Sequence, residues 1–432
     1  MDTRKAWFLS MIEEICKQLL AFQNAQGDFP KKNLSISLEP VMLLTLLKAQ
    51  IDIFPAIYWQ DKELQQRIVC FGAIDDKLAI PHVCNEARYY GGLAFQQQGD
   101  QWPGFPATRF IRPALEFIEE NNSLTLTCHF DGNFCIEDTL ALVHKLRSPV
   151  TLQKMNTLQI SRSDLPGKQQ WSGLVDLCIE YKALLPKVVL SRQTELICSE
   201  TIDHCDLLCQ WEKANPASFH FSFQFNKDDV FIGCSPERLF SRTGRTLHTE
   251  ALAGTVNRGR NDREDNILLQ SLLTDKKIDR ENYLVQEFII ANLMSLKAQV
   301  HCEQPHVMQL HNVQHLCVPI KAELLTTTKD AELLYKLHPT PAVGGTPKLP
   351  ALQFINDKEP YCRGWYAGAV GYISQHKSDF SVAIRSALIS ANKIKLFAGA
   401  GIVTGSIADQ EWQELDNKIH TVLDILTQTE DK

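Results

Sequence analysis

The carboxyl-terminal part of the sequence places two carboxylates and an ammonium group at helical spacing, directly after a glycine-rich stretch. Residues 397–418 read FAGAGIVTGSIADQEWQELDNK and include Glu411, Glu414 and Lys418. Offsets of three and seven residues put these side chains on one face of a helix. Such a face, beside glycines that let a ligand approach the backbone, suits a hard cation with an anionic organic ligand. A solvated helix end with i,i+3 and i,i+4 charge pairs has the same pattern.

Two charged residues at the edges of apolar strands could transfer protons. Lys187 begins the predicted strand KVVLSR, where a lysine either extends to solvent or points inward. If it points inward, desolvation would lower the pKa of the amine, which could then act as a general base. Glu237 follows Pro236 between apolar segments, where desolvation would raise the carboxyl pKa, as a general acid requires. The alternative for Glu237 is a turn carboxylate paired with Arg238.

Two further charges interrupt apolar patterns. Glu281 lies on the apolar stripe of a helix predicted from residue 278 to residue 296. A carboxylate there needs a metal or a cationic partner, for which Arg280 or a nearby lysine is available. Arg385 lies inside a predicted apolar strand and needs an anion, either a protein carboxylate or a ligand.

A group of histidines near residue 310 does not predict a zinc site. The segment VMQLHNVQHLCVPI is typical of a strand, in which residues i and i+4 are about 13 Å apart. No CxxC or HExxH motif supports zinc. We expect only His315 to face the site. The histidines concerned are His301, His306, His311 and His315.

Composition excludes several classes of function. The 432 residues are 44% hydrophobic and carry a net charge of −7 without a basic block, so we expect no nucleic-acid partner. No apolar run reaches the roughly 18 residues of a membrane span, and the amphipathic N-terminus is not a signal peptide. The 13 cysteines form no CxxC pair, as is typical of reduced thiols. We therefore expect a soluble, cytoplasmic protein. The sequence has no GxGxxG, P-loop or GxSxG motif.

The chain divides into two predicted portions. Residues 1–150 are expected to contribute a helix (1–24) and strands, with the segment RPALEFIEE either a short helix or an interrupted strand. This first third contains no recognisable catalytic constellation. Polar residues 146–170 predict a linker, and residues 165–432 form the catalytic region. In that region FHFSFQF (219–225) alternates with period two and is the firmest strand prediction.

Several phrases in fixed order carry a family resemblance. They are LPKVVLSR, CSPERLF, TEALAGT, DRENYLV, VQHL, HPTPAVGG, RGWYAGAVGY, AIRSA, AGAGIVTGS and EWQELDNK. Over about residues 170–425 the chain resembles the chorismate-utilising enzymes, which include anthranilate synthase, aminodeoxychorismate synthase, salicylate synthase and isochorismate synthase. It is most similar to the isochorismate synthases of menaquinone biosynthesis. The resemblance implies an α/β (α+β) fold of two large, mostly antiparallel sheets packed as a sandwich, with helices outside and the site between the sheets.

The resemblance also implies residue roles. Lys187 matches the base that activates water for attack at C2 of chorismate, and Glu237 matches the acid that protonates the departing C4 hydroxyl. Glu281 and Glu414 match ligands of Mg²⁺, with Glu411 as a helper, and the Mg²⁺ anchors the ring carboxylate. The positions that match substrate contacts are Gly254, Ala342, Tyr366, Arg385, Gly399 and Lys418.

Short sequence differences from the amine-adding members of the family favour water as the nucleophile. Amine-adding relatives usually have PIAGT where this chain has EALAGT, and aminodeoxychorismate synthase has a lysine at the position of Ala253. Salicylate synthase and the siderophore-pathway isochorismate synthases are the closest alternatives. A non-catalytic chorismate-binding subunit of an amidotransferase is a second hypothesis, but we expect no amidotransferase partner.

Overall fold

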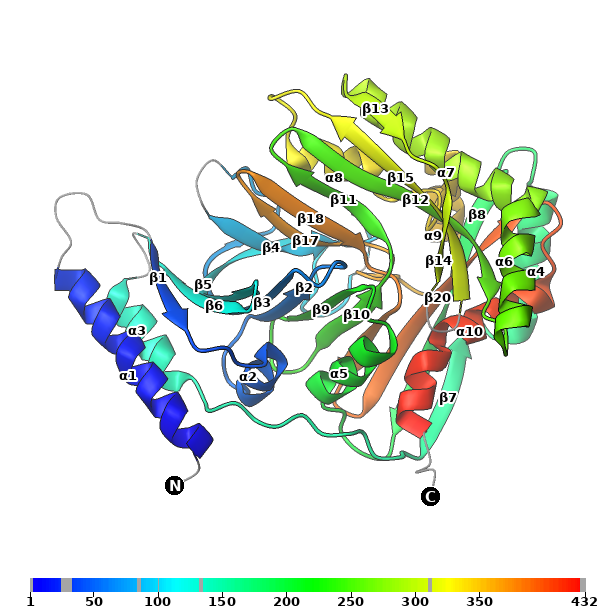
Figure 1. The fold of residues 1–432 in the computed structure, drawn as a ribbon. Helices are drawn as coiled ribbons and strands as arrows, with labels where there is room; N and C mark the ends of the chain where they lie inside the picture. The colour runs from blue at the N-terminus through cyan, green and yellow to red at the C-terminus, as the bar shows by residue number, and fades with distance from the viewer. Residues whose placement is uncertain are drawn as a thin grey trace.

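Antiparallel strand pairing dominates the computed structural model, which describes residues 3–24, 33–83, 87–99, 101–131, 135–309 and 313–427 (Figure 1). The helices are α1 (Thr3–Asn24), α2 (Leu43–Ala49), α3 (Ile136–Lys145), α4 (Lys168–Glu180), α5 (His204–Ala214), α6 (Asp262–Thr274), α7 (Lys276–Ser295), α8 (Asp330–Leu337), α9 (Lys348–Lys358) and α10 (Ala408–Thr427). No helix within these described ranges is long and apolar enough to cross a membrane.

Strand β5 (Thr108–Glu120) joins two arms of the sheet, because it pairs with β3 (Gln66–Lys77) along one edge and with β4 (Arg88–Leu93) along the other. The first arm runs from β3 through β2 (Ala56–Gln60), β9 (Phe219–Gln224), β10 (Val230–Ser235), β19 (Ser386–Ser390) and β20 (Lys393–Val403) to β8 (Lys187–Cys198), which also pairs with β7 (Ile160–Leu165) and β16 (Gly345–Thr346).

The second arm runs from β4 through β17 (Ala369–Ser374), β18 (Lys377–Val382), β11 (Arg238–Thr243) and β12 (Thr246–Asn257) to β15 (Val313–Glu323), whose other edge carries β13 (Gln299–Cys302) and β14 (His306–Gln309). Beside β4, β6 (Ser123–His129) pairs with β5 and with β1 (Asn33–Leu38). All of these pairings are antiparallel.

Aromatic side chains pack between the two arms. The ring of Trp59 in β2 lies 6.4 Å from that of Tyr372 in β17, edge to face, a geometry that aromatic pairs favour. Helices cover the outside: α10 and α4 contact β20, and α7 contacts β12 and β15 (Figure 1). The two arms are the layers of the predicted sandwich, which is confirmed as an α+β fold; hydrogen bonds through β3 and β5 make them one continuous sheet.

Local predictions in the first third are partly confirmed. The helix predicted over 1–24 is α1, with Ile15 and Leu19 fully buried. The segment RPALEFIEE is neither a helix nor an interrupted strand, because it continues β5 without a break. Pro113 is tolerated there because β3 shifts register opposite it, between Ala73 and Asp75, where one ladder hydrogen bond is not needed.

The linker prediction is wrong for its second half. Residues 146–159 have no regular structure, but β7 occupies 160–165 and α4 begins at Lys168. The sequence ISRSDL is polar because β7 is an edge strand on β8 whose side chains are mostly exposed. Strand structure is confirmed for the described parts of the segment VMQLHNVQHLCVPI, which belong to β14 and β15 and include His315, whereas His311 lies outside the described residues.

Candidate active site

A cavity of about 310 Å³ lies between β20 and β8 of the first arm and β12 and β15 of the second. This volume is at the lower end of the range for small-molecule sites. Most residues of the predicted site, although far apart in the sequence, line it together. The lining includes Glu237, Gly254, Glu281, Ala342, Tyr366, Arg385, Gly399, Glu411, Glu414 and Lys418.

The Lys187 side chain points inward and contacts Glu281, which lines the cavity. It begins β8 between Thr346 of β16 and Val403 of β20. Its side chain is 0% exposed, and its Nζ lies 2.9 Å from Glu281 Oε1. A Cβ on Gly401 would lie 2.9 Å from that Oε1 and 3.2 Å from Lys187 Cε, so a larger residue there would press on this pair. The alternative in which Lys187 extends to solvent is therefore wrong.

Helix α7 is anchored so that Glu281 faces the cavity. The next residue, Asn282, is fully buried, and its Nδ2 donates to the backbone oxygens of Ala251 (3.0 Å), Ala253 (3.2 Å) and Leu316 (3.0 Å). One amide thus ties α7 to both β12 and β15. A buried side chain that satisfies three carbonyls fixes the rotation of its helix. The cationic partner of Glu281 is Lys187, from a distant strand, and not its neighbour Arg280.

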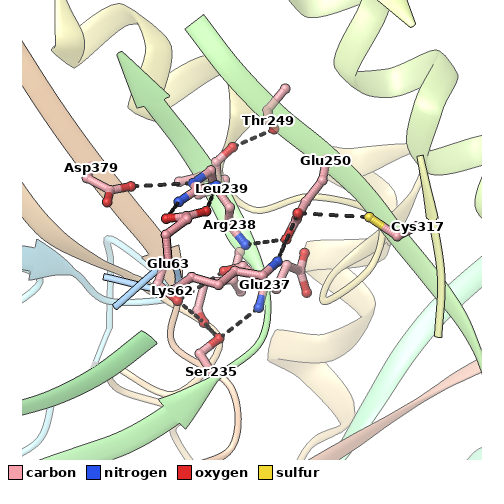
Figure 2. Close-up of polar contacts among 12 residues, drawn as sticks. Lys62, Glu63, Ser235, Glu237, Arg238, Leu239, Thr249, Glu250, Cys317 and Asp379 are labelled. Carbon is pink, nitrogen blue, oxygen red and sulfur yellow. Dashed lines mark hydrogen bonds and ion pairs between the residues drawn. The ribbon is translucent and has the colours of Figure 1, made fainter. Parts of the chain in front are cut away.

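Glu237 sits at the junction of β10 and β11 and is 3% exposed. Burial raises the pKa of its carboxyl to about 8, and the nearby charge of Glu250 adds to the rise, while Lys187 and Lys62 oppose it. The expected rise is confirmed, and the side chain is mostly protonated at neutral pH. The alternative of an Arg238 pair is wrong, because the Arg238 guanidinium binds Glu63 (Figure 2).

Cationic groups form the wall around Gly399. Lys418 Nζ donates to the Gly399 oxygen at 2.7 Å and to Glu414 Oε1 at 2.5 Å. Arg385 Nη1 donates to the Lys418 oxygen at 2.9 Å. Its Nη2 is buried and has no hydrogen-bond partner within the described part of the chain. A buried, unpartnered guanidinium nitrogen on a cavity wall suits a carboxylate ligand.

Arg385 is also held in an uncommon backbone conformation. Its φ is +50°, a left-handed region in which a residue other than glycine costs roughly 1–3 kcal/mol. Burial lowers the pKa of its guanidinium to about 10, against the effects of Glu414 and Tyr366, so it stays charged at pH 7. Such strain concentrates at functional sites.

Two glycines of the predicted set leave space for neighbouring side chains. A Cβ on Gly399 would lie 2.9 Å from the Tyr366 hydroxyl, whose ring stacks on Phe397 at 5.0 Å. Gly254 has φ +84°, and a Cβ there would lie 2.4 Å from Ile278 Cγ2. His315 lines the cavity as expected, and burial followed by the charges of Arg385 and Lys418 holds its pKa well below the usual value.

Several cavity residues are not predicted from the sequence. Gln410, Asp275 and Ile384 also line the cavity. Gln410 precedes Glu414 by four residues, so helical spacing could have indicated it. Asp275 carries no comparable signal, because it stands between two helices. Glu250 belongs to the TEALAGT phrase, for which the resemblance implies a role only at Gly254.

Three carboxylates, Glu281, Glu411 and Glu414, line the cavity. The described residues contain no group of three or more His, Cys, Asp and Glu side chains that could hold a metal by themselves. Mg²⁺, however, usually binds one or two carboxylates together with water and substrate oxygens. A divalent ion fits this donor set, provided that the substrate supplies further oxygens.

Comparisons with known proteins agree with this geometry. The family model described as chorismate binding enzyme matches residues 62–427. The chain is 34% identical to isochorismate synthase MenF of Escherichia coli over 381 residues, 84% of this chain and 86% of that one. It is 33% identical to isochorismate synthase MenF of Haemophilus influenzae over 392 residues, 89% of each.

A solved structure is also similar. The structure of MenF, the menaquinone-specific isochorismate synthase from Escherichia coli, superposes with a TM-score of 0.86 and 31% identity, covering 97% of this chain and 100% of that one. The family match begins just before β3 and ends with α10, so it includes every residue that lines the cavity. The chain belongs to the chorismate-binding enzyme family.

Proposed function

We propose that the protein is an isochorismate synthase of the menaquinone type, which interconverts chorismate and isochorismate. The observation that carries this proposal is the presence of two groups suited to proton transfer at one cavity. They are the Glu237 carboxyl, which lines the cavity and has a pKa of about 8, and the fully buried Lys187 amine, which contacts the cavity-lining Glu281. Arg385 and Lys418 supply positive charge for a dianionic substrate in a protein of net charge −7.

The proposed reaction moves a hydroxyl between two ring positions. Lys187 takes a proton from water as the oxygen bonds to C2 of chorismate. The ring double bonds shift, and the C4–O bond breaks as Glu237 gives its proton to the departing hydroxyl, which leaves as water. One water enters and one leaves, so substrate and product are isomers. Proton exchange with solvent returns both side chains to their starting forms.

Carboxylates of the cavity would hold Mg²⁺. In this proposal Glu281 and Glu414 are the ligands and Glu411 assists them. When bound, the ion supplies positive charge that anchors a carboxylate of chorismate. Glu281 and Glu414 each pair with a lysine in the structure, with Lys187 at 2.9 Å and Lys418 at 2.5 Å. A divalent cation held by these carboxylates would therefore have to compete with the two lysine contacts.

Glu414→Gln should weaken Mg²⁺ binding measured by calorimetry, because an amide has no charge and offers one oxygen. We expect a loss at least as large as the roughly 10–100-fold cost of removing an outer-shell partner of a metal. Asp409→Asn is the control, since Asp409 lies on the same helix in a largely exposed pair with Lys168. Equal Mg²⁺ affinity in wild type and Glu414→Gln would remove Glu414 from the ligand set.

The Glu237 pKa predicts the pH dependence of turnover. The acid must be protonated to act, and its pKa is about 8. As pH rises through 8 the carboxyl loses its proton, so kcat/KM should fall by about tenfold per pH unit above that value. A kcat/KM profile between pH 6 and pH 10 checks this. A basic limb near pH 5 would show that this carboxyl is not the acid.

Product analysis separates the related activities. Purified protein with chorismate and Mg²⁺ should give isochorismate, resolved by HPLC. Salicylate plus pyruvate as the main product would instead support a salicylate synthase. Turnover without ammonia or a second protein would exclude the amidotransferase-subunit hypothesis. A siderophore-pathway role would give the same product, so it is separated by the growth requirement of a deletion strain: menaquinone for the proposed role, siderophore for the alternative.

A further inference from the structure

The backbone around Glu237 is held on several sides (Figure 2). The Ser235 hydroxyl accepts the Glu237 N–H at 3.3 Å and donates to the Val382 oxygen at 2.6 Å. The Glu237 oxygen accepts from Ser381 Oγ at 3.0 Å and from the Val382 N–H at 3.1 Å. The peptide groups of Glu237 are therefore held by contacts that do not involve its neighbour, Arg238.

The next peptide is fixed by Glu250 of β12. The Arg238 N–H donates to Glu250 Oε1 at 2.8 Å. Lys62 Nζ donates to the same carboxylate twice, to Oε1 at 2.7 Å and Oε2 at 3.0 Å. The side chains of Lys62 and Glu250 are only 12% and 10% exposed. Removing one partner of so buried a pair leaves an uncompensated charge, which costs more than an exposed pair would.

The residue after Lys62 binds the Arg238 side chain. Arg238 Nη1 and Nη2 donate to Glu63 Oε1 and Oε2 at 2.8 and 2.7 Å, a bidentate contact of the geometry that gives the strongest side-chain pairing. Consecutive residues of one turn thus reach Arg238 by two routes: Lys62 through Glu250 to its backbone, and Glu63 to its guanidinium. We call Lys62, Glu63, Arg238 and Glu250 the acid clamp.

The turn itself is well fixed. It connects β2 with β3, and Asp61 Oδ1 accepts the N–H groups of Gln65 at 2.7 Å and Gln66 at 3.2 Å. An aspartate that caps its own turn holds the following residues in place. The first third of the chain, which has no predicted catalytic residue of its own, therefore presents Lys62 and Glu63 to the segment that carries the acid, between β10 and β11 (Figure 2).

We propose that the Lys62–Glu63 turn is a positioning element for the general acid Glu237, acting through Glu250 and Arg238. The proposal rests on the proposed function, because it takes Glu237 as the acid. Lys62 and Glu63 do not line the cavity and act only through the two residues that they hold. The clamp fixes the direction of the acid side chain, and the Glu250 carboxylate disfavours a second negative charge beside it.

The groups that face Glu237 come from four segments. They are Glu250 of β12, Lys187 of β8, Lys62 of the turn and the Thr340 hydroxyl after α8. Glu250 raises the pKa of Glu237, and Lys187 and Lys62 lower it. Removal of the Glu250 charge should therefore move the basic limb of the pH–rate profile toward lower pH.

The test compares kcat, KM and the pH profile of clamp variants with chorismate as substrate. Glu250→Gln should lower kcat by roughly tenfold to a hundredfold, the scale of a misplaced catalytic group. KM should stay within about twofold, since substrate contacts are unchanged. The basic limb should shift to lower pH. Lys62→Arg, which keeps the charge, should recover most of the kcat that Lys62→Gln loses.

Asp330→Asn is the matched control. Asp330 is 8% exposed and pairs with Arg242 at 2.8 Å, a buried ion pair that does not touch the cavity. It should lower the melting temperature while leaving kcat and the basic limb unchanged. If Glu250→Gln does not fold, Lys62→Gln takes its place: a loss of kcat with KM retained supports the clamp, and a wild-type kcat overturns it.

Two outcomes with the folded variants would overturn the proposal. One is a wild-type kcat and basic limb in Glu250→Gln. The other is an equal loss of kcat in Glu250→Gln and Asp330→Asn with no shift of the limb, which would indicate general destabilisation. Wild-type turnover is measured first, so a failure of the proposed function shows in the wild type and a failure of the clamp shows only in the variants.

Discussion

Lys187→Ala should reduce the turnover of chorismate by roughly 10²–10⁴-fold, the contribution of a positioned general base. The methyl group that remains cannot take a proton from water, and the one lysine that lines the cavity among the described residues, Lys418, is paired with Glu414. The fold should persist, because β8 keeps its long pairing with β20. Steady-state kinetics measure the loss, and chorismate affinity, read by calorimetry, should change little.

Lys48→Ala is the matched control for this variant. Lys48 is also largely buried, at 11% exposure, and pairs with Asp206 at 2.5 Å away from the cavity. It should cost stability without a comparable loss of kcat. If Lys187→Ala retained near-normal turnover, the activation of water would have to be assigned to another group.

Glu237→Gln should cause the second large loss, also about 10²–10⁴-fold in kcat. Glutamine has nearly the same shape and fills the same buried position, but it cannot donate a carboxyl proton to the departing C4 hydroxyl. Because burial raises the pKa of the wild-type carboxyl, this position favours a neutral side chain. The neutral amide should therefore not destabilise the fold. Melting temperature and kcat together separate these effects: the first should be unchanged or higher, the second almost abolished.

Glu212→Gln provides the comparison. Burial also raises the pKa of Glu212, to about 7, but this residue lines a different cavity with Tyr58 and His220. Its replacement should leave kcat close to wild type. Similar rates for the Glu237 and Glu212 variants would show that a buried, protonated carboxyl at position 237 has no special part in the reaction.

Sequence patterns predicted the residue set of the cavity well where local spacing decides the geometry. Helical offsets placed Glu411, Glu414 and Lys418 on one face of α10, and all three line the cavity. Alternation predicted β9, and the apolar stripe predicted the inward face of α7. In these cases one residue's position follows from its neighbours in the chain.

Long-range contacts decided the cases that the sequence left open. The inward position of Lys187 is accompanied by a pairing with Glu281, which lies on a distant helix. The partner of Arg238 is Glu63, from the first third of the chain, and no local pattern indicates it. The polar residues of β7 predict a linker, but they reflect the position of this strand at a sheet edge, which only the pairing with β8 reveals.

Turnover of chorismate in H₂¹⁸O tests most directly the central claim that water is the nucleophile and attacks C2. Mass and NMR analysis of the product at early times locates the label. We predict isochorismate that carries ¹⁸O at C2, formed without ammonia and without salicylate. Isochorismate with an unlabelled C2 hydroxyl, or salicylate and pyruvate as the main products, would contradict the account.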